Sequence, residues 1–154
     1  MDNIDLEILD LLQKDASAPV AQIAERVNLS TTPCWRRIEK LRQQGVIDRQ
    51  VTLLNRDALN VGLTAFVGIR TNQHSPEWLR RFAEAVRDIH EIVECYRMSG
   101  ETDYMLRVVI PDVKAFDGVY NRLIEKIELY DVTTSFAMED LKYSTALPLD
   151  YVSG

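Results

Sequence analysis

Apolar side chains recur every three or four positions in three short segments near the start of the chain, at about residues 3–14, 20–27 and 30–45. This spacing places them on one side of a helix with about 3.6 residues per turn. A three-residue turn, 28–30, separates the second segment from the third. The pattern therefore predicts three helices around a small core, and the last two helices form a helix-turn-helix. The predicted core positions are Ile4, Ile8, Leu11, Leu12, Val20, Ile23, Ala24, Val27, Cys34, Ile38 and Leu41.

The third segment carries start and stop signals of a helix. Ser30 stands where an N-cap is expected, and its hydroxyl can accept a hydrogen bond from an amide of the first turn. Pro33 lies early enough for its missing amide proton to be tolerated, and Gly45 can end the helix in a left-handed conformation.

The opposite side of this third helix is polar and basic. An exposed helix of this kind suits the major groove of DNA, because cations contact phosphates and short polar groups reach base edges. Arg37 lies nearer to the apolar side than Arg36, so we expect it to brace the fold and to contact DNA only at a phosphate. Trp35 can contact DNA or pack on the neighbouring helix. The predicted DNA-binding residues are Ser30, Thr31, Thr32, Trp35, Arg36, Arg37 and Lys40.

The pattern changes after the third helix. Residues 46–54 are rich in β-type side chains and predict a connecting strand and hinge, followed by a boundary near 55–60. Beyond residue 61, alternating strands and helical segments follow in the order β-α-β-β-α-β, which is the ferredoxin-like arrangement with both helices on one sheet face. The other sheet face then needs a second copy of the chain to cover it, so we expect at least a homodimer. The expected strands are 63–70, 92–98, 104–110 and 132–138, and the expected helices begin near Ser75 and Pro111.

Charge is unevenly distributed along the 154 residues. The net charge is −6, which at first argues against a nucleic-acid partner. Within residues 35–49, however, five cations stand against two anions. The positive potential is therefore concentrated on the third helix, and the acidic remainder would suppress indiscriminate binding.

Composition and residue spacing argue against a membrane span, a redox sensor and a metal or catalytic site. No apolar run is long enough to predict a membrane span. Cys34 and Cys95 both fall in apolar patterns and are expected to be reduced packing residues of a cytoplasmic protein; a redox sensor would need an exposed thiol of low pKa. The two histidines, His74 and His90, belong to no cluster with metal-ligand spacing, so we expect no metal, no cofactor and no catalytic residues.

Four segments carry a further pattern: residues 4–9, 23–30, 37–41 with 45–47, and 99–106. In this order and at this spacing, they resemble the Lrp/AsnC (feast/famine) family of bacterial and archaeal transcriptional regulators. The resemblance implies an α+β chain with a helix-turn-helix DNA-binding domain (1–54), a linker (55–60) and a ferredoxin-like effector-binding and oligomerisation domain (61–154). It also implies a cytoplasmic, nucleoid-associated homodimer that assembles into octamers on double-stranded DNA. Residues 31–35 and 135–139 resemble a subgroup linked to amino-acid catabolism.

The resemblance further implies an effector site for a small amino acid between neighbouring dimers. In the family this site is lined by the glycine-containing turn between the second and third strands, here residues 100–104. Backbone amides near Gly100 would hold a carboxylate, and Asp103 or Glu101 would meet the ammonium group. Asp103 can also simply satisfy amides within the turn. The expected effector residues are Met98, Gly100, Glu101, Thr102, Asp103, Tyr104, Thr133, Thr134 and Ser135.

The expected function is therefore regulation of amino-acid metabolism by a DNA-binding protein that is controlled allosterically by an amino acid. One alternative is a tetrapyrrole decarboxylase of the sirohaem type, since such enzymes resemble this family and keep a degenerate helix-turn-helix. Those enzymes use histidines near their pocket, whereas His74 and His90 lie outside the expected turn. A second alternative is an amino-acid sensor that does not touch DNA, which the complete polar side of the third helix disfavours.

Overall fold

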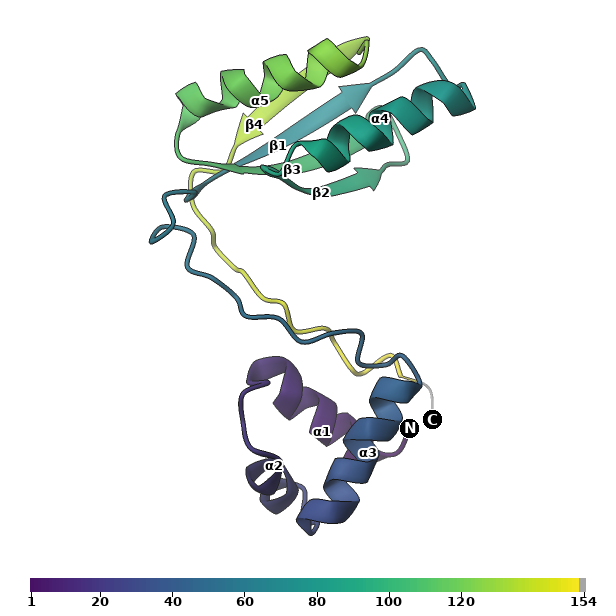
Figure 1. Cartoon of the computed structure of the whole chain (residues 1–154), viewed down its shortest axis with the longest axis vertical. Coiled ribbons are helices and arrows are strands. Elements are labelled where there is room, and N and C mark those ends of the chain that lie inside the picture. The colour runs from purple at the N-terminus through teal and green to yellow at the C-terminus, as the bar shows by residue number, and fades with distance from the viewer. Residues whose placement is uncertain (153–154) are drawn as a thin grey trace. The chain divides into compact units, whose positions relative to one another are not determined.

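The computed structural model describes residues 1–152, which divide into two compact units (Figure 1). One unit contains residues 1–53 together with 142–152, and the other contains residues 54–141. Each unit has its own hydrophobic core. In chain order the elements are α1 (Asn3–Lys14), α2 (Val20–Arg26), α3 (Thr31–Gln43), β1 (Leu63–Arg70), α4 (Pro76–Asp88), β2 (Ile92–Arg97), β3 (Tyr104–Ile110), α5 (Val113–Lys126) and β4 (Asp131–Phe136).

The N-terminal unit has the predicted three-helix arrangement. α1 begins at a reciprocal cap, in which the Asp2 carboxylate accepts from the Asp5 amide at 2.9 Å and the Asp5 carboxylate accepts from the Asp2 amide at 3.2 Å. This satisfies amide groups that the first turn of a helix leaves without partners. The apolar sides of the three helices meet in one core. Its buried members are Ile8, Ile23, Ala24, Val27, Cys34, Ile38 and Leu41.

The start of α3 differs from the prediction, whereas its end agrees with it. Ser30 has the extended backbone of an N-cap, but its hydroxyl accepts no hydrogen bond from the helix, so this part of the prediction is wrong. A reason lies in the sequence: the third helical position, whose amide a capping hydroxyl often bonds, is Pro33 and has no N–H. Gly45 does end the helix in a left-handed conformation, with φ of 72°. Its amide donates to Arg42 O and that of Val46 to Leu41 O, both at 3.0 Å, which closes the last turn.

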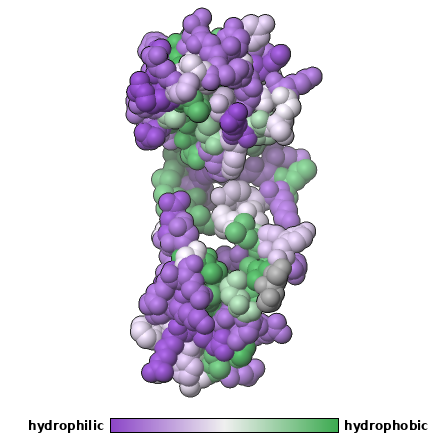
Figure 2. Space-filling view, turned by 90° about the vertical axis from the view of Figure 1, so that its right-hand side faces the viewer, coloured by the Kyte–Doolittle hydropathy of each residue, from purple (hydrophilic) through white to green (hydrophobic). Residues whose placement is uncertain are grey.

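The expected connecting strand at 46–54 is absent from the described structure. Val51, Leu53 and Leu54 stay 60–67% exposed, and hydrophobic side chains are visible among hydrophilic ones on the surface (Figure 2). A strand needs a partner whose backbone groups it can bond. The β-type side chains of residues 46–54 predicted a strand without identifying the neighbouring strand that it would need.

The second unit is the predicted ferredoxin-like fold. Its described strands form an antiparallel sheet in the order β2-β3-β1-β4, and α4 and α5 cover one face of it (Figure 1). Alternate positions of the two central strands point towards these helices, as the pattern predicted. The buried core consists of Ala65, Val67, Ile69, Trp78, Phe82, Ala85, Ile89, Leu106, Val108, Ile110, Val119, Leu123 and Ile127.

The opposite face of the sheet carries the intervening positions of each strand. Phe66 and Tyr96 are 42% and 54% exposed. Phe66 is on β1 and Tyr96 on β2, and β3 lies between these two strands. Arg107 of β3 forms an ion pair with Glu94 of β2 at 2.5 Å. This face therefore combines exposed aromatic rings with a charged pair.

The last described residues, 142–152, belong to the N-terminal unit. The side-chain amide of Gln13 donates to Leu147 O at 3.1 Å and accepts from the Leu147 amide at 2.9 Å. The expected second domain ran to residue 154, whereas the structure groups 142–152 with residues 1–53. Tertiary contacts of this kind leave no periodic pattern in the tail.

Candidate nucleic-acid interface and effector site

The outer side of α3 is exposed, as predicted. Its core stripe (Cys34, Ile38 and Leu41) is buried, and this fixes which side faces outwards. Trp35 is 51% exposed, so it does not pack into the unit's core. The exposed members of the predicted DNA-binding set are Ser30, Thr31, Thr32, Trp35, Arg36 and Lys40.

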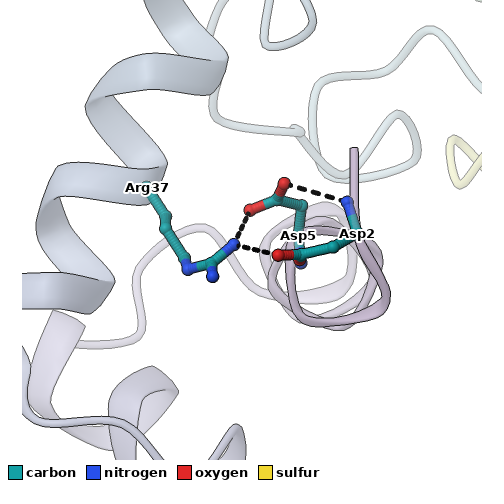
Figure 3. Close-up of polar contacts among 3 residues, drawn as sticks. All are labelled: Asp2, Asp5 and Arg37. Atoms are coloured by element: carbon teal, nitrogen blue, oxygen red, sulfur yellow. Dashed lines mark hydrogen bonds and ion pairs between the residues drawn. The ribbon is translucent and has the colours of Figure 1, made fainter. Parts of the chain in front are cut away.

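Arg37 differs from the rest of that set. Its Nη1 atom forms ion pairs with the carboxylates of Asp2, the N-cap of α1, and Asp5 in the first turn of α1, both at 2.7 Å (Figure 3). The hydrogen bonds that Arg37 donates to the Asp5 and Asp2 carboxylates raise the pKa of its guanidinium. The bracing role that its position allowed is therefore the one the structure shows, and we call this arrangement the Arg37 clamp. The clamp joins the start of α1 to the middle of α3.

Acidification is expected to weaken the Arg37 clamp. The pKa of Asp2 is lowered, first by the Asp5 amide and then by the Arg37 guanidinium. A carboxyl whose pKa is lower in the folded state contributes stability that is present above its unfolded pKa of about 4 and is lost as the pH falls through the folded value. Arg37→Gln should therefore lower the melting temperature most at pH 7, and the difference from the unmodified protein should narrow below about pH 4. The same difference at pH 7 and pH 3 would contradict this.

The remaining cations of α3 and the following turn fall into two groups. Two of them form ion pairs: Arg42 Nη1 lies 2.5 Å from Glu39 Oε1, and Arg49 Nε lies 3.8 Å from Asp48 Oδ2. Over residues 1–152, by contrast, neither Arg36 nor Lys40 has an ion-pair partner. Among the cations of α3 and the following turn, the positive charge that no ion pair offsets therefore lies on the outer side of α3.

The predicted effector turn is built around backbone hydrogen bonds. Gly100 has φ of 110°, a conformation that favours glycine. The Met98 amide donates to Asp103 O at 2.8 Å, and the Asp103 amide donates to Ile69 O at 2.9 Å. The Asp103 carboxylate accepts from the Thr71 amide at 2.8 Å. Asp103 thus satisfies backbone groups, the alternative left open for it, and it fastens the turn to the end of β1.

The turn lies over the uncovered face of the sheet at Gly68, which the sequence reasoning missed. A Cβ atom at Gly68 would lie 3.4 Å from Thr102 Cγ2 and 3.8 Å from Thr133 O. Gly68 therefore lets the turn approach β1 and β4 closely. An isolated glycine inside a predicted strand is the signal that could have identified it.

Two residues of the expected effector set lie elsewhere. The Tyr104 ring packs among aromatic side chains under the helices, with its centroid 4.6 Å from that of Phe82. Thr134 is half-buried and alternates with exposed neighbours along β4, so it belongs to the helix-covered face. A strand turns successive side chains to opposite faces, and the expected run of three residues ignored this. The structure places Thr102 and Thr133 together at Gly68, with Ser135 on the same face and Met98, Gly100 and Glu101 exposed in or beside the turn.

The cysteines and possible metal ligands add no further site. Cys34 is buried, and burial raises the pKa of its thiol, which opposes a redox role. Cys95 is exposed on the edge strand β2, contrary to the expected packing. No group of three His, Cys, Asp or Glu residues within the described part of the chain could hold a metal ion. None of the helices described is long and apolar enough to cross a membrane.

Comparison with known proteins identifies both units. Residues 1–42 match the AsnC-type helix-turn-helix domain, and residues 64–147 match the Lrp/AsnC ligand binding domain. The chain is 45% identical over 151 residues to the DNA-binding transcriptional activator DecR of Escherichia coli K12, covering 97% of this chain and 99% of that protein.

Solved structures agree with this assignment. The crystal structure of an AsnC family transcriptional regulator from Agrobacterium tumefaciens is 55% identical, with a TM-score of 0.96, and the match covers 99% of this chain and 100% of that one. A transcriptional regulator from Neisseria meningitidis, solved as a complex with L-Met, is 32% identical with a TM-score of 0.92, covering 97% of each chain. The chain therefore belongs to the Lrp/AsnC family of DNA-binding transcriptional regulators, with an AsnC-type helix-turn-helix domain followed by an Lrp/AsnC ligand-binding domain.

Proposed function

We propose that the outer side of α3 binds operator DNA, with Arg36 and Lys40 on phosphates and the hydroxyls of Ser30, Thr31 and Thr32 near base edges. The observation that carries this proposal is the pair of exposed cations without ion-pair partners in residues 1–152. The Arg37 clamp supports it, because the clamp holds α3 against α1 without using either cation. Arg37 itself acts as a brace, and Trp35 adds an exposed ring beside the cations.

A small amino acid is the proposed effector, and it binds at the turn over Gly68. The amides near Gly100 hold its carboxylate, and the exposed carboxylate of Glu101 takes its ammonium group, since Asp103 already accepts from Thr71. Thr102, Thr133 and Ser135 offer hydroxyls on the same face. The Neisseria relative solved with L-Met supports an amino acid as the ligand.

The proposed active form is a homo-oligomer in the bacterial cytoplasm. The uncovered sheet face exposes Phe66 and Tyr96 and would be shared with a second copy, in a dimer that assembles further into octamers. A dimer presents two α3 helices, which would read half-sites about 34 Å apart or multiples of that distance. The amino acid, bound between dimers, would favour one assembly through its higher affinity for that state.

Removing the two cations tests the DNA-binding proposal. We expect the double variant Arg36→Ala, Lys40→Ala to bind an operator fragment, selected from random-sequence DNA by the unmodified protein, at least about tenfold more weakly, because two phosphate contacts are lost. Gel-shift titration at fixed salt measures this. The matched control, Arg87→Ala with Lys114→Ala, removes two exposed cations from α4 and α5 and should bind normally. Equal affinity of the two double variants would refute the assignment to α3.

A further inference from the structure

The last described residues, 142–152, form what we call the C-terminal strap, and they lie against α1. The carboxamide of Gln13 bonds both the carbonyl and the amide of Leu147, at 3.1 and 2.9 Å. The carboxamide of glutamine has an NH₂ group that donates and an oxygen that accepts. It can therefore bond both the carbonyl and the amide of a peptide unit, as the backbone of a neighbouring strand does. The contact is therefore specific for the backbone of the strap.

Apolar contact adds to these two hydrogen bonds. Leu149 and Val152 are half-buried, and the Val152 amide donates to Leu149 O at 3.2 Å, which folds the end of the strap into a turn. The strap forms one wall of a groove of about 910 Å³. The other wall includes Leu6 and Leu11 of α1, together with Val27, which directly follows α2.

The strap is held only lightly. Leu147 and Tyr151 remain 73% and 86% exposed, and the groove is not filled. Segments with few buried apolar contacts open locally at a small free-energy cost. The strap therefore has the features of a segment that docks and releases while the helices stay folded.

The strap, α1 and α3 form one continuous series of contacts. Gln13 holds the strap at one end of α1, while Asp2 and Asp5 at the other end hold Arg37 of α3. We propose that the C-terminal strap is a detachable part of the DNA-binding unit: docked, it steadies α1 and, through the Arg37 clamp, α3; released, it leaves α3 less firmly placed. The effect on DNA affinity rests on the proposed function of α3, whereas docking itself does not.

Hydrogen exchange of the intact chain tests the docking. Gln13→Ala removes both side-chain hydrogen bonds and keeps a residue that favours helix. We expect the Leu147 amide to exchange about tenfold faster or more in this variant, because two hydrogen bonds shift an equilibrium by at least about that factor. The matched control is Gln22→Ala, an exposed glutamine of α2, which should leave this amide unchanged. Equal exchange of the Leu147 amide in all three proteins would overturn the proposal.

The link to DNA is tested separately. We expect Gln13→Ala, and a chain ending at Leu141, to bind the selected operator fragment about three- to tenfold more weakly, with faster exchange along α1. If the Leu147 amide of Gln13→Ala exchanged faster as expected but the affinity of this variant for DNA did not change, the link between the strap and α3 would be overturned. If the Arg36, Lys40 double variant also bound DNA normally, the assignment of α3 would have failed instead, and the exchange result would still report docking.

Discussion

Leu41→Ala is expected to unfold the N-terminal unit while the second unit stays folded. Leu41 is 1% exposed and packs from α3 into a small core, which has seven buried residues in the described part of the chain. Replacing a buried leucine by alanine costs about 2–5 kcal/mol, which includes the cavity left behind. A unit of about 60 residues has little stability to lose. This one substitution should therefore consume most or all of it.

Hydrogen exchange followed by mass spectrometry distinguishes the two units in the intact chain. Amides of α3 should lose protection in Leu41→Ala, and those of β1 and β3 should keep theirs, because the two cores share no residue. Leu79→Ala removes the same atoms from a side chain that is 44% exposed and should change neither unit by more than about 1 kcal/mol. Loss of protection in the strands as well would show that the two units do not fold separately.

Gly68→Val is expected to abolish the response to the amino-acid effector. A Cβ atom at this position would lie 3.4 Å from Thr102 Cγ2, and the two methyl groups of valine would occupy the space beneath the turn. Valine suits a strand, so the sheet itself should tolerate the change. In the unmodified protein, an amino acid at a hundred times its Kd stabilises the fold by about 2.7 kcal/mol. The variant should show none of this stabilisation.

Thermal-shift measurements with each of the twenty amino acids test this expectation and name the effector. Gly118→Ala is the matched control, because a Cβ atom at Gly118 meets nothing within 4 Å and alanine favours helix. This control should keep the full shift. If Gly68→Val kept it too, the effector would bind away from the turn over Gly68.

The spacing of apolar side chains predicted the helices and the four strands of the sheet well, because buried positions recur every two residues in a strand and every three or four in a helix. The i, i+4, i+7 spacing of Cys34, Ile38 and Leu41 was enough to orient α3 and to expose its other side. Alternation along β1 and β3 was likewise enough to identify the face that α4 and α5 cover. These signals lie within a few residues of one another.

What the sequence left undetermined depends on partners far apart in the chain. Arg37 is 32 residues from Asp5 and Gln13 is 134 from Leu147, so neither contact follows from periodicity. The β-type run at 46–54 found no partner strand in the described chain. Thr134 could have been excluded by alternation, and Gly68 could have been noticed as an isolated glycine in a strand. Both signals were present in the sequence.

The dependence of DNA binding on salt tests most directly whether the outer side of α3 is the contact surface. For each phosphate contact, the logarithm of affinity falls with the logarithm of salt concentration with a slope of about −0.9. Losing Arg36 and Lys40 should therefore make the slope of the double variant less steep by about 1.8 for each bound head. Parallel lines for the two proteins, or an affinity of the unmodified protein that does not change with salt, would contradict the account.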